Sequence, residues 1–132
     1  MELFRVIQSV HEIESAARFY EQVLGTSGER VSAGRHYFHC GATILACYDP
    51  LADGDAMNGG WRPHSNQYLY FTTEDIEATA RRVEAAGGTI VAPIESMPWG
   101  ETLFYARDPS GNRIAFVARS TMFVGGVSDR SA

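Results

Sequence analysis

Four histidines are the side chains of this sequence with the widest chemical use, because imidazole binds metal ions and transfers protons near neutral pH. His36 and His39 lie three residues apart in an expected strand, so their side chains point to opposite faces and cannot hold one ion together. His11 stands beside Glu12 at a strand-to-helix turn, where a solvated or capping role is the simpler interpretation. His64 lies in a loop, from which it could reach the rim of a cavity. We therefore predict no metal site and no cofactor.

Arg5 is a charged residue inside an otherwise apolar stretch, residues 3–10. Burying a lone guanidinium is costly, so Arg5 either pairs with an internal carboxylate, for which Glu95 and Glu101 are candidates, or meets an anionic or aromatic ligand. Both interpretations stay open. Every basic residue of the chain is an arginine, so Schiff-base catalysis by lysine is excluded and anionic groups would be bound by guanidinium.

Aromatic residues outside the expected apolar sets form a second signal, and they are Tyr68, Tyr70, Trp61 and Trp99. Flat ligands stack on such rings. In the structural alternative, Trp99 closes the end of a barrel and Trp61 covers a dimer seam. Phe38 and Phe104 are further candidates for the lining of a cavity, but a shift of one residue along a strand would send them to the other face.

Residues for nucleophilic or acid-base catalysis lack their usual partners. Cys40 follows His39 directly in a strand, so the two side chains diverge. We expect Cys40 and Cys47 to be reduced, small core residues. Asp108 opens the turn DPSGN and is expected to accept hydrogen bonds within that turn, which is a structural role. Glu101 and Asp108 are the carboxylates near the second set of closing strands that an acid-base mechanism could use.

Composition limits the class of function. The chain has 132 residues, enough for one domain with its own core, and a formal net charge of -5. It offers no basic surface for nucleic acid, no signal sequence and no apolar run long enough to cross a membrane. We therefore expect a cytoplasmic protein whose partner is a small-molecule ligand, with neither nucleic acid nor membrane as a partner.

The chain repeats one pattern of elements. A strand at 3–10 and a helix at 12–25 recur at 66–73 and 75–88, so that the two helices start 63 residues apart. Closing strands at 41–48 and 111–118 each begin at Gly and follow the aromatic strands HYFHC and LFYAR. The pattern predicts an α+β fold, with two tandem β-α-β-β-β modules that form a curved mixed sheet around a ligand cavity. The expected segments are a first module (1–48), a linker loop (49–65), a second module (66–118) and a tail (119–132), together one domain.

Alternation along the strands predicts which side chains face the helices. The set packed under the helices comprises Phe4, Val6, Val10, Ile44, Ala46, Tyr48, Leu69, Phe71, Ile114, Phe116 and Ala118. The opposite set faces the cavity and comprises Arg5, Ile7, Ser9, Thr43, Leu45, Cys47, Tyr68, Tyr70, Thr72, Arg113, Ala115 and Val117.

Three segments, EIESAARFYEQVLG, YFTTEDIEATARRVEAAGG and WGETLFYARDPSGNRIAF, carry a resemblance to a known family. Over residues 3–118 the chain resembles the vicinal oxygen chelate superfamily, also called the glyoxalase, bleomycin resistance protein and extradiol dioxygenase superfamily. The resemblance implies paired β-α-β-β-β modules, usually assembled as a dimer. It also implies that metal ligands in the enzymes of the superfamily come from the first and last strands of each module.

Carried onto this chain, those ligand positions are Arg5, Tyr68, Leu45 and Ala115. Arg, Leu and Ala have no lone pair to give a divalent ion, and one phenol does not make a site. In this respect the chain is similar to the drug-binding resistance proteins of the superfamily.

The leading hypothesis is a metal-free homodimer that binds a small aromatic or amphipathic molecule, such as an antibiotic or a toxic metabolite. The predicted ligand-binding residues are Arg5, Ile7, Phe38, Leu45, Trp61, Tyr68, Tyr70, Trp99, Phe104 and Ala115. The alternative is a divalent-metal-dependent lyase, isomerase or dioxygenase with ligands from unusual places such as His36, His64 or Glu101. A third hypothesis is a scaffold with no ligand, in which Glu101 neutralises Arg5.

Overall fold

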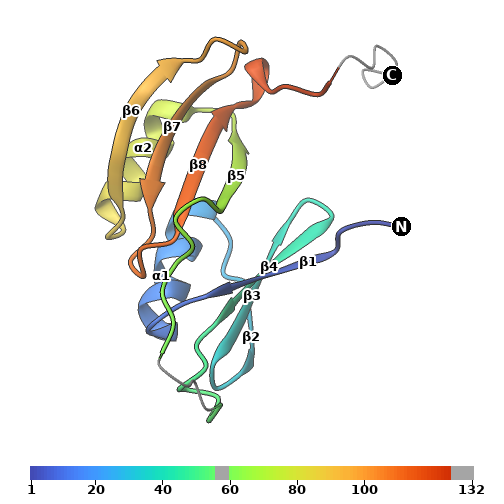
Figure 1. The fold of residues 1–132 in the computed structure, drawn as a ribbon, viewed down its shortest axis with the longest axis vertical. Helices are drawn as coiled ribbons and strands as arrows, with labels where there is room; N and C mark the ends of the chain where they lie inside the picture. The colour runs from blue at the N-terminus through green and yellow to red at the C-terminus, as the bar shows by residue number, and fades with distance from the viewer. Residues whose placement is uncertain (56–59, 126–132) are drawn as a thin grey trace.

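The computed structural model describes residues 1–55 and 60–125, which form two β-α-β-β-β modules (Figure 1). The elements of the first module are β1 (Arg5–Ser9), α1 (Ile13–Leu24), β2 (Glu29–Ser32), β3 (Arg35–Cys40) and β4 (Thr43–Tyr48). Those of the second are β5 (Tyr68–Thr73), α2 (Ile76–Ala85), β6 (Thr89–Ser96), β7 (Thr102–Arg107) and β8 (Arg113–Ala118), followed by the short helix η1 (Arg119–Thr121). The predicted α+β class and the tandem repeat are confirmed. Part of the predicted linker and the end of the predicted tail lie outside the described residues.

Capping residues set the ends of both helices close to the predicted limits. The Glu12 carboxylate accepts from the Ser15 N–H at the start of α1, and Gly25 ends that helix with a φ of 75°. The Asp75 carboxylate accepts from the Ala78 N–H at the start of α2. No helix within residues 1–55 or 60–125 combines the length and the apolar character needed to cross a membrane.

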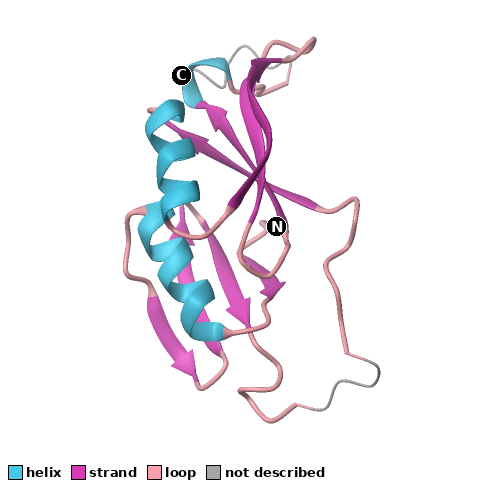
Figure 2. Ribbon diagram, turned by 90° about the vertical axis from the view of Figure 1, so that its left-hand side faces the viewer, coloured by secondary structure: helices cyan, strands magenta, loops and turns pink. Residues whose placement is uncertain are grey.

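The strands form two four-stranded mixed sheets, in the orders β1-β4-β3-β2 and β5-β8-β7-β6. In each sheet the first and last strands of the module run parallel, and the remaining pairs are antiparallel. We expected one curved sheet, but β1 and β5 are each hydrogen-bonded along one edge only. Both helices lie on the same side of the molecule (Figure 2), so each sheet has one face turned away from the helices, which we call its open face.

One hydrophobic core serves both modules. Its buried residues are Val10, Ile13, Ala16, Phe19, Tyr20, Val23, Phe38, Leu45, Cys47, Val83, Phe104, Ala106, Ile114 and Phe116. The contact between the modules is close at Gly88, where an added Cβ would lie 2.7 Å from Cε1 of Phe19 in α1. The modules are therefore packed against each other as one unit.

The register of the closing strands differs by one residue from the predicted register. Val6 pairs with Leu45, and its counterpart Leu69 pairs with Ile114. Leu45 thus corresponds to Ile114, 69 residues later, and both side chains lie in the core. The prediction that Leu45 lies on the face opposite the helices was wrong, because we aligned the two strands on their first isoleucines. Ala46, not Leu45, is the counterpart of Ala115 on the open face.

The first strand shows a second departure from its predicted pattern. Phe4 was expected under the helix, but it precedes β1 and its side chain is 54% exposed. The helix-facing side instead carries Val6, Gln8 and Val10, of which Gln8 is polar and buried. This glutamine is satisfied inside the core, since its Nε2 donates to the Tyr20 hydroxyl at 3.3 Å.

Candidate functional site

Three tyrosines form a cluster on the open face of the second sheet. Tyr68 and Tyr70 come from β5, and Tyr105 comes from β7. The Tyr105 ring lies edge-on to the other two, with ring centroids 5.5 Å from Tyr68 and 6.2 Å from Tyr70. The Tyr68 and Tyr70 side chains are exposed, at 40% and 52%. This tyrosine cluster gives flat ligands a surface on which to stack.

Ala115 lies between two of the tyrosines, Tyr70 and Tyr105, on the middle strand β8. It pairs with Tyr70 on one side and Tyr105 on the other, so the three side chains form one row across β5, β8 and β7. The small Ala115 side chain is fully buried, and the hydroxyls of the two tyrosines lie 2.9 Å apart above this row. Partial desolvation, and then the hydrogen bond to Tyr105, raise the pKa of Tyr70. Both effects favour the protonated, hydrogen-bond-donating form of the Tyr70 phenol.

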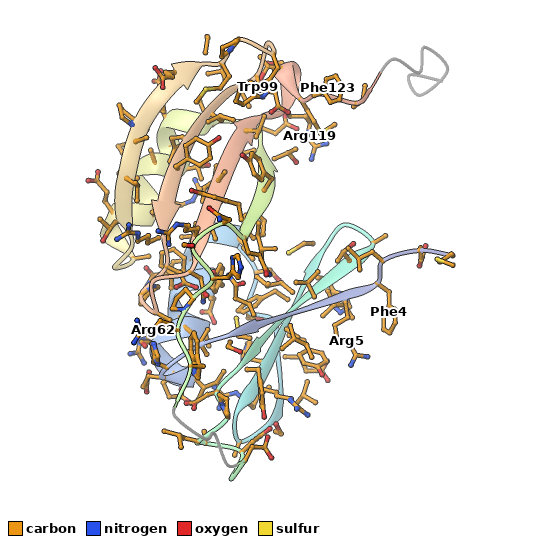
Figure 3. The ribbon with its side chains drawn as sticks, viewed as in Figure 1. Phe4, Arg5, Arg62, Trp99, Arg119 and Phe123 are labelled. Atoms are coloured by element: carbon orange, nitrogen blue, oxygen red, sulfur yellow. The ribbon has the colours of Figure 1, made fainter. Side chains whose placement is uncertain are left out.

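An apolar hollow of about 360 Å³ adjoins the cluster at the end of the sheet where β5 and β8 finish. Its lining includes Tyr70, Trp99, Met122 and Phe123, and we call the last three the apolar patch. Glu101 fixes two parts of it, since its carboxylate accepts from the indole N–H of Trp99 and from the Phe123 N–H, each at 2.8 Å. Trp99 and Phe123 lie close together at this end of the molecule (Figure 3).

Arg5 does not join the tyrosine cluster. Its guanidinium lies 4.9 Å from the ring centroid of Phe4 and 5.3 Å from that of Tyr37, and both Arg5 and Phe4 point away from the second sheet (Figure 3). Among the described residues no ion pair joins Arg5 to the two predicted carboxylates, Glu95 and Glu101. The guanidinium is instead stacked on rings of its own module, and contact of Arg5 with a ligand stays a prediction.

Phe38, Phe104 and Leu45 lie in the core and not on an open face, although Leu45 also lines a hollow of about 260 Å³ between β4 and β5. Phe38 and Phe104 are fully buried in the core cluster, and Leu45 is 3% exposed in the same cluster. Because side chains alternate along a strand, the open face at these places belongs to their neighbours. Tyr105, next to Phe104, is the residue of the tyrosine cluster that sequence reasoning missed, because its position beside Ala115 depends on the register between β7 and β8.

Ile7 and Trp61 lie on a different surface from the tyrosine cluster. Both line a hollow of about 230 Å³, together with His64 and other residues of the linker. Trp61 is stacked on His11, with ring centroids 4.1 Å apart and an angle of 13° between the planes. Ile7 is 54% exposed. The predicted site residues are therefore divided among the second sheet with its apolar patch, the first module with the loop that carries Trp61, and the core.

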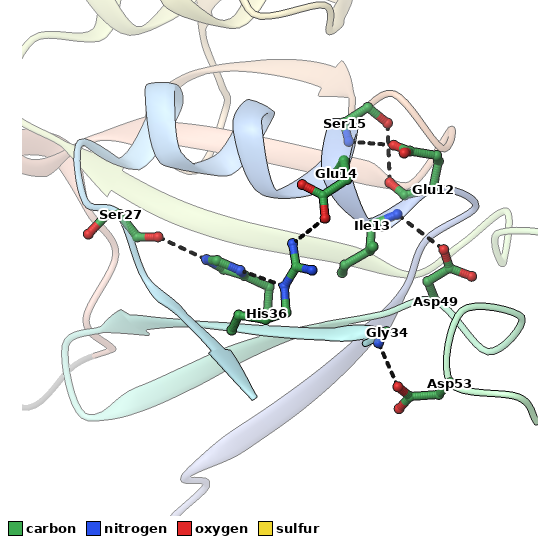
Figure 4. A network of polar contacts seen from close by, with 10 residues as sticks. Glu12, Ile13, Glu14, Ser15, Ser27, Gly34, His36, Asp49 and Asp53 are labelled. Atoms are coloured by element: carbon green, nitrogen blue, oxygen red, sulfur yellow. Dashed lines mark hydrogen bonds and ion pairs between the residues drawn. The ribbon is translucent and has the colours of Figure 1, made fainter. Parts of the chain in front are cut away.

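Polar groups of the first module that could ligate a metal ion make structural contacts instead (Figure 4). The Nε2 of His36 lies 2.8 Å from the Ser27 carbonyl, and its Nδ1 accepts from the Arg30 Nε at 3.2 Å. The Asp49 carboxylate accepts from the Ile13 N–H, at the start of α1. Within the part of the chain that the structure describes, no three His, Cys, Asp or Glu side chains gather as a ligand set.

The two cysteines are poor nucleophiles in this environment. Burial raises the pKa of the Cys47 thiol to about 12, and it also raises the pKa of Cys40. Neither is paired in a disulfide. Because the thiolate is the reactive form, both side chains are inert near neutral pH.

Comparison with protein-family models shows the family to which this chain belongs. Residues 3–116 match the family Glyoxalase, described as the Glyoxalase/Bleomycin resistance protein/Dioxygenase superfamily. The chain belongs to this superfamily.

Individual proteins are also similar to this chain. The protein named "Putative glyoxylase CFP32" from Mycobacterium tuberculosis is 31% identical over 101 residues, which is 73% of this chain but 36% of that protein's length. "Virulence protein STM3117" from Salmonella typhimurium is 29% identical over 112 residues, covering 83% of this chain and 78% of that protein. A glyoxalase-related enzyme from Fulvimarina pelagi shares the fold, with a TM-score of 0.77 at 20% identity over 96% of this chain and 94% of the other.

The positions that the resemblance assigns to metal ligands do not suit a metal ion in this member of the superfamily. With the corrected register they are Arg5, Ala46, Tyr68 and Ala115. The two alanines have no donor atom and the guanidinium has no free lone pair, which leaves one phenol. We therefore derive no chemical step through a metal at this place.

Proposed function

We propose that this chain binds a small aromatic or amphipathic molecule, and that it does so without a metal ion. The tyrosine cluster carries the proposal, because it is an exposed aromatic surface held in fixed geometry on a sheet. Ligand sites are typically apolar and aromatic surfaces with a few polar groups that orient the ligand. The paired hydroxyls of Tyr70 and Tyr105 and the adjoining apolar patch provide such a combination.

If the ligand is an antibiotic or a toxic metabolite, binding it would protect the cell by removing it from solution. Such protection needs no catalytic group. The alternative is a metal-dependent lyase, isomerase or dioxygenase of the same superfamily. The names of two similar proteins, a glyoxylase and a glyoxalase-related enzyme, favour that alternative for those proteins. The two proposals differ in metal content, so metal analysis separates them.

The test combines metal analysis with binding of a neutral two-ring probe, biphenyl-4-carboxamide. Protein purified without affinity metal is expected to hold less than one tenth of an ion of manganese, nickel, zinc or iron per chain. Calorimetry is expected to show that Tyr70→Ala weakens probe binding about tenfold, because stacking on one ring contributes roughly 0.5–1.5 kcal/mol beyond the buried area. Tyr70→Phe keeps the ring and should bind almost as well as the unchanged protein. One tightly bound ion per chain, or no effect of Tyr70→Ala, would reject the proposal.

The proposal includes a homodimer. The first module exposes Phe4 and Ile7, the second exposes the tyrosine cluster, and β1 and β5 each have one free edge. A second chain that covers these faces would bury apolar surface and could complete the walls of a cavity. Light scattering is expected to give twice the chain mass of 14.5 kDa, and Ile7→Glu to shift the protein toward the monomer. A monomeric mass at micromolar concentration would contradict this part.

A further inference from the structure

Two arginines face each other beside the tyrosine cluster, and sequence reasoning did not select them as a pair. Arg107 in β7 pairs directly with Arg113 in β8, and Arg113 pairs with Tyr68 on its other side. Arg113 lies two residues before Ala115 and Arg107 two residues after Tyr105. By strand alternation both side chains lie on the same open face as the tyrosine cluster.

Like charges directly opposite on neighbouring strands destabilise a sheet unless something neutralises them. In residues 1–55 and 60–125 the ion pairs involve Arg30, Arg35 and Arg119, and none involves Arg107 or Arg113. Neither guanidinium makes a side-chain hydrogen bond to a described residue. The exposed Arg107 and the half-buried Arg113 are thus neighbours on the sheet with no carboxylate partner among the described residues, which leaves their guanidinium groups available to an anionic ligand.

The two arginines lie beside a hollow in the protein surface. A cavity of about 100 Å³ is lined by both of them and by Tyr68 and Tyr105. Arg113 also lines the hollow under the linker, where Arg62 is a further guanidinium. A carboxylate in this position would contact guanidinium groups on one side and tyrosine rings on the other.

The chemical character of the open face of the second sheet thus changes along its strands, from charged to aromatic to apolar. Arg113 stands at the start of β8, the tyrosine cluster follows, and Val117 lies at the end of β8 beside the apolar patch. From Arg113 to Val117 the strand advances by about 13 Å, at roughly 3.3 Å per residue. A molecule that fills this face would have an anionic end, a flat middle and an apolar end.

We propose that Arg107 and Arg113 bind the carboxylate of an elongated aromatic acid, whose rings lie on the tyrosine cluster and whose far end reaches the apolar patch. The proposal deepens the proposed function and rests on it, since it names the chemical class of the ligand. Arginine suits this role because its planar fork matches the geometry of a carboxylate.

Calorimetry with a matched pair of probes tests the proposal. Biphenyl-4-carboxylate and biphenyl-4-carboxamide have the same shape and differ in charge. At 50 mM salt the carboxylate is expected to bind at least tenfold more tightly than the amide, because hydrogen bonds to charged groups are the stronger ones. Arg113→Gln should remove this preference, because the substitution weakens carboxylate binding far more than amide binding. The control is Arg81→Gln, at an exposed position on α2 without hydrogen bonds or ion pairs to described residues, and it should keep the preference.

The outcomes separate the two proposals. Equal binding of the two probes, or a preference that survives Arg113→Gln, overturns the carboxylate site while the aromatic surface stands. Failure of both probes to bind overturns both proposals.

A measurement without ligand gives a second test. If an internal or partner carboxylate already neutralises the arginines, Arg107→Gln will lower the melting temperature by several degrees, and the proposal is wrong. Under the proposal, Arg107→Gln removes one of two like charges. It should then leave the melting temperature at low salt unchanged or raise it.

Discussion

Asp108→Ala is expected to lower the free energy of unfolding by about 3 kcal/mol, because the substitution leaves several buried donors without an acceptor. The Asp108 carboxylate accepts from the Tyr20 hydroxyl at 2.7 Å and from the Asn112 side-chain amide at 3.0 Å. It also accepts from the backbone N–H groups of Ser110 and Asn112, each at 2.9 Å. For a chain of this size the melting temperature should fall by roughly 10 °C, which differential scanning calorimetry would measure.

Asp75→Ala is the matched control, because Asp75 is an exposed aspartate that caps α2 through one hydrogen bond. Loss of such a cap costs about 1 kcal/mol. Equal losses of stability in the two variants would show that the contacts of Asp108 in the core contribute no more than an ordinary helix cap.

Phe104→Ala and Tyr105→Ala should differ sharply, although the residues are neighbours in β7. Phe104 is fully buried in the core, and its ring is stacked against that of Phe116, with ring centroids 5.2 Å apart. Its truncation is expected to cost about 3–5 kcal/mol. Tyr105 lies on the open face, and its truncation is expected to cost about 1 kcal/mol from lost ring contacts. Denaturant unfolding measures both values.

Ligand binding should show the reverse order. Tyr105→Ala is expected to weaken binding of biphenyl-4-carboxamide about tenfold, because it removes one ring of the tyrosine cluster. Phe104→Ala, measured well below its melting temperature, should bind nearly as well as the unchanged protein. A stable Phe104→Ala variant together with an unfolded Tyr105→Ala variant would mean that the strand faces were assigned the wrong way round.

Local signals were sufficient to predict both helices and most strands of this fold, but they did not locate β2 and β6. Glu12 and Asp75 cap helices that begin one residue later, and Gly25 ends the first helix where it was expected. The turn role of Asp108 is confirmed by its bonds to the N–H groups of Ser110 and Asn112. These features depend on residues a few positions apart, so the sequence contains the information directly.

The candidate site was harder to predict, because it depends on register between strands that are distant in the chain. Aligning Ile44 with Ile114 placed Leu45 on the wrong face, since one residue reverses every side chain of a strand. The expectation of an internal carboxylate for Arg5 assumed that its side chain is buried, but Arg5 is exposed and lies over the rings of Phe4 and Tyr37. That Arg107 and Arg113 are opposite each other likewise becomes known only from the register between β7 and β8.

The shared core of the two modules limits how a ligand can enter. Opening by a hinge requires a boundary that separates with little loss of contact. Here the hydrogen bond from Tyr20 to Asp108 and the apolar residues of α1 cross that boundary. In the proposed dimer, ligand exchange would then follow dissociation of the subunits instead of bending within one of them. Occupancy of the site would depend on the concentration of the protein as well as on that of the ligand.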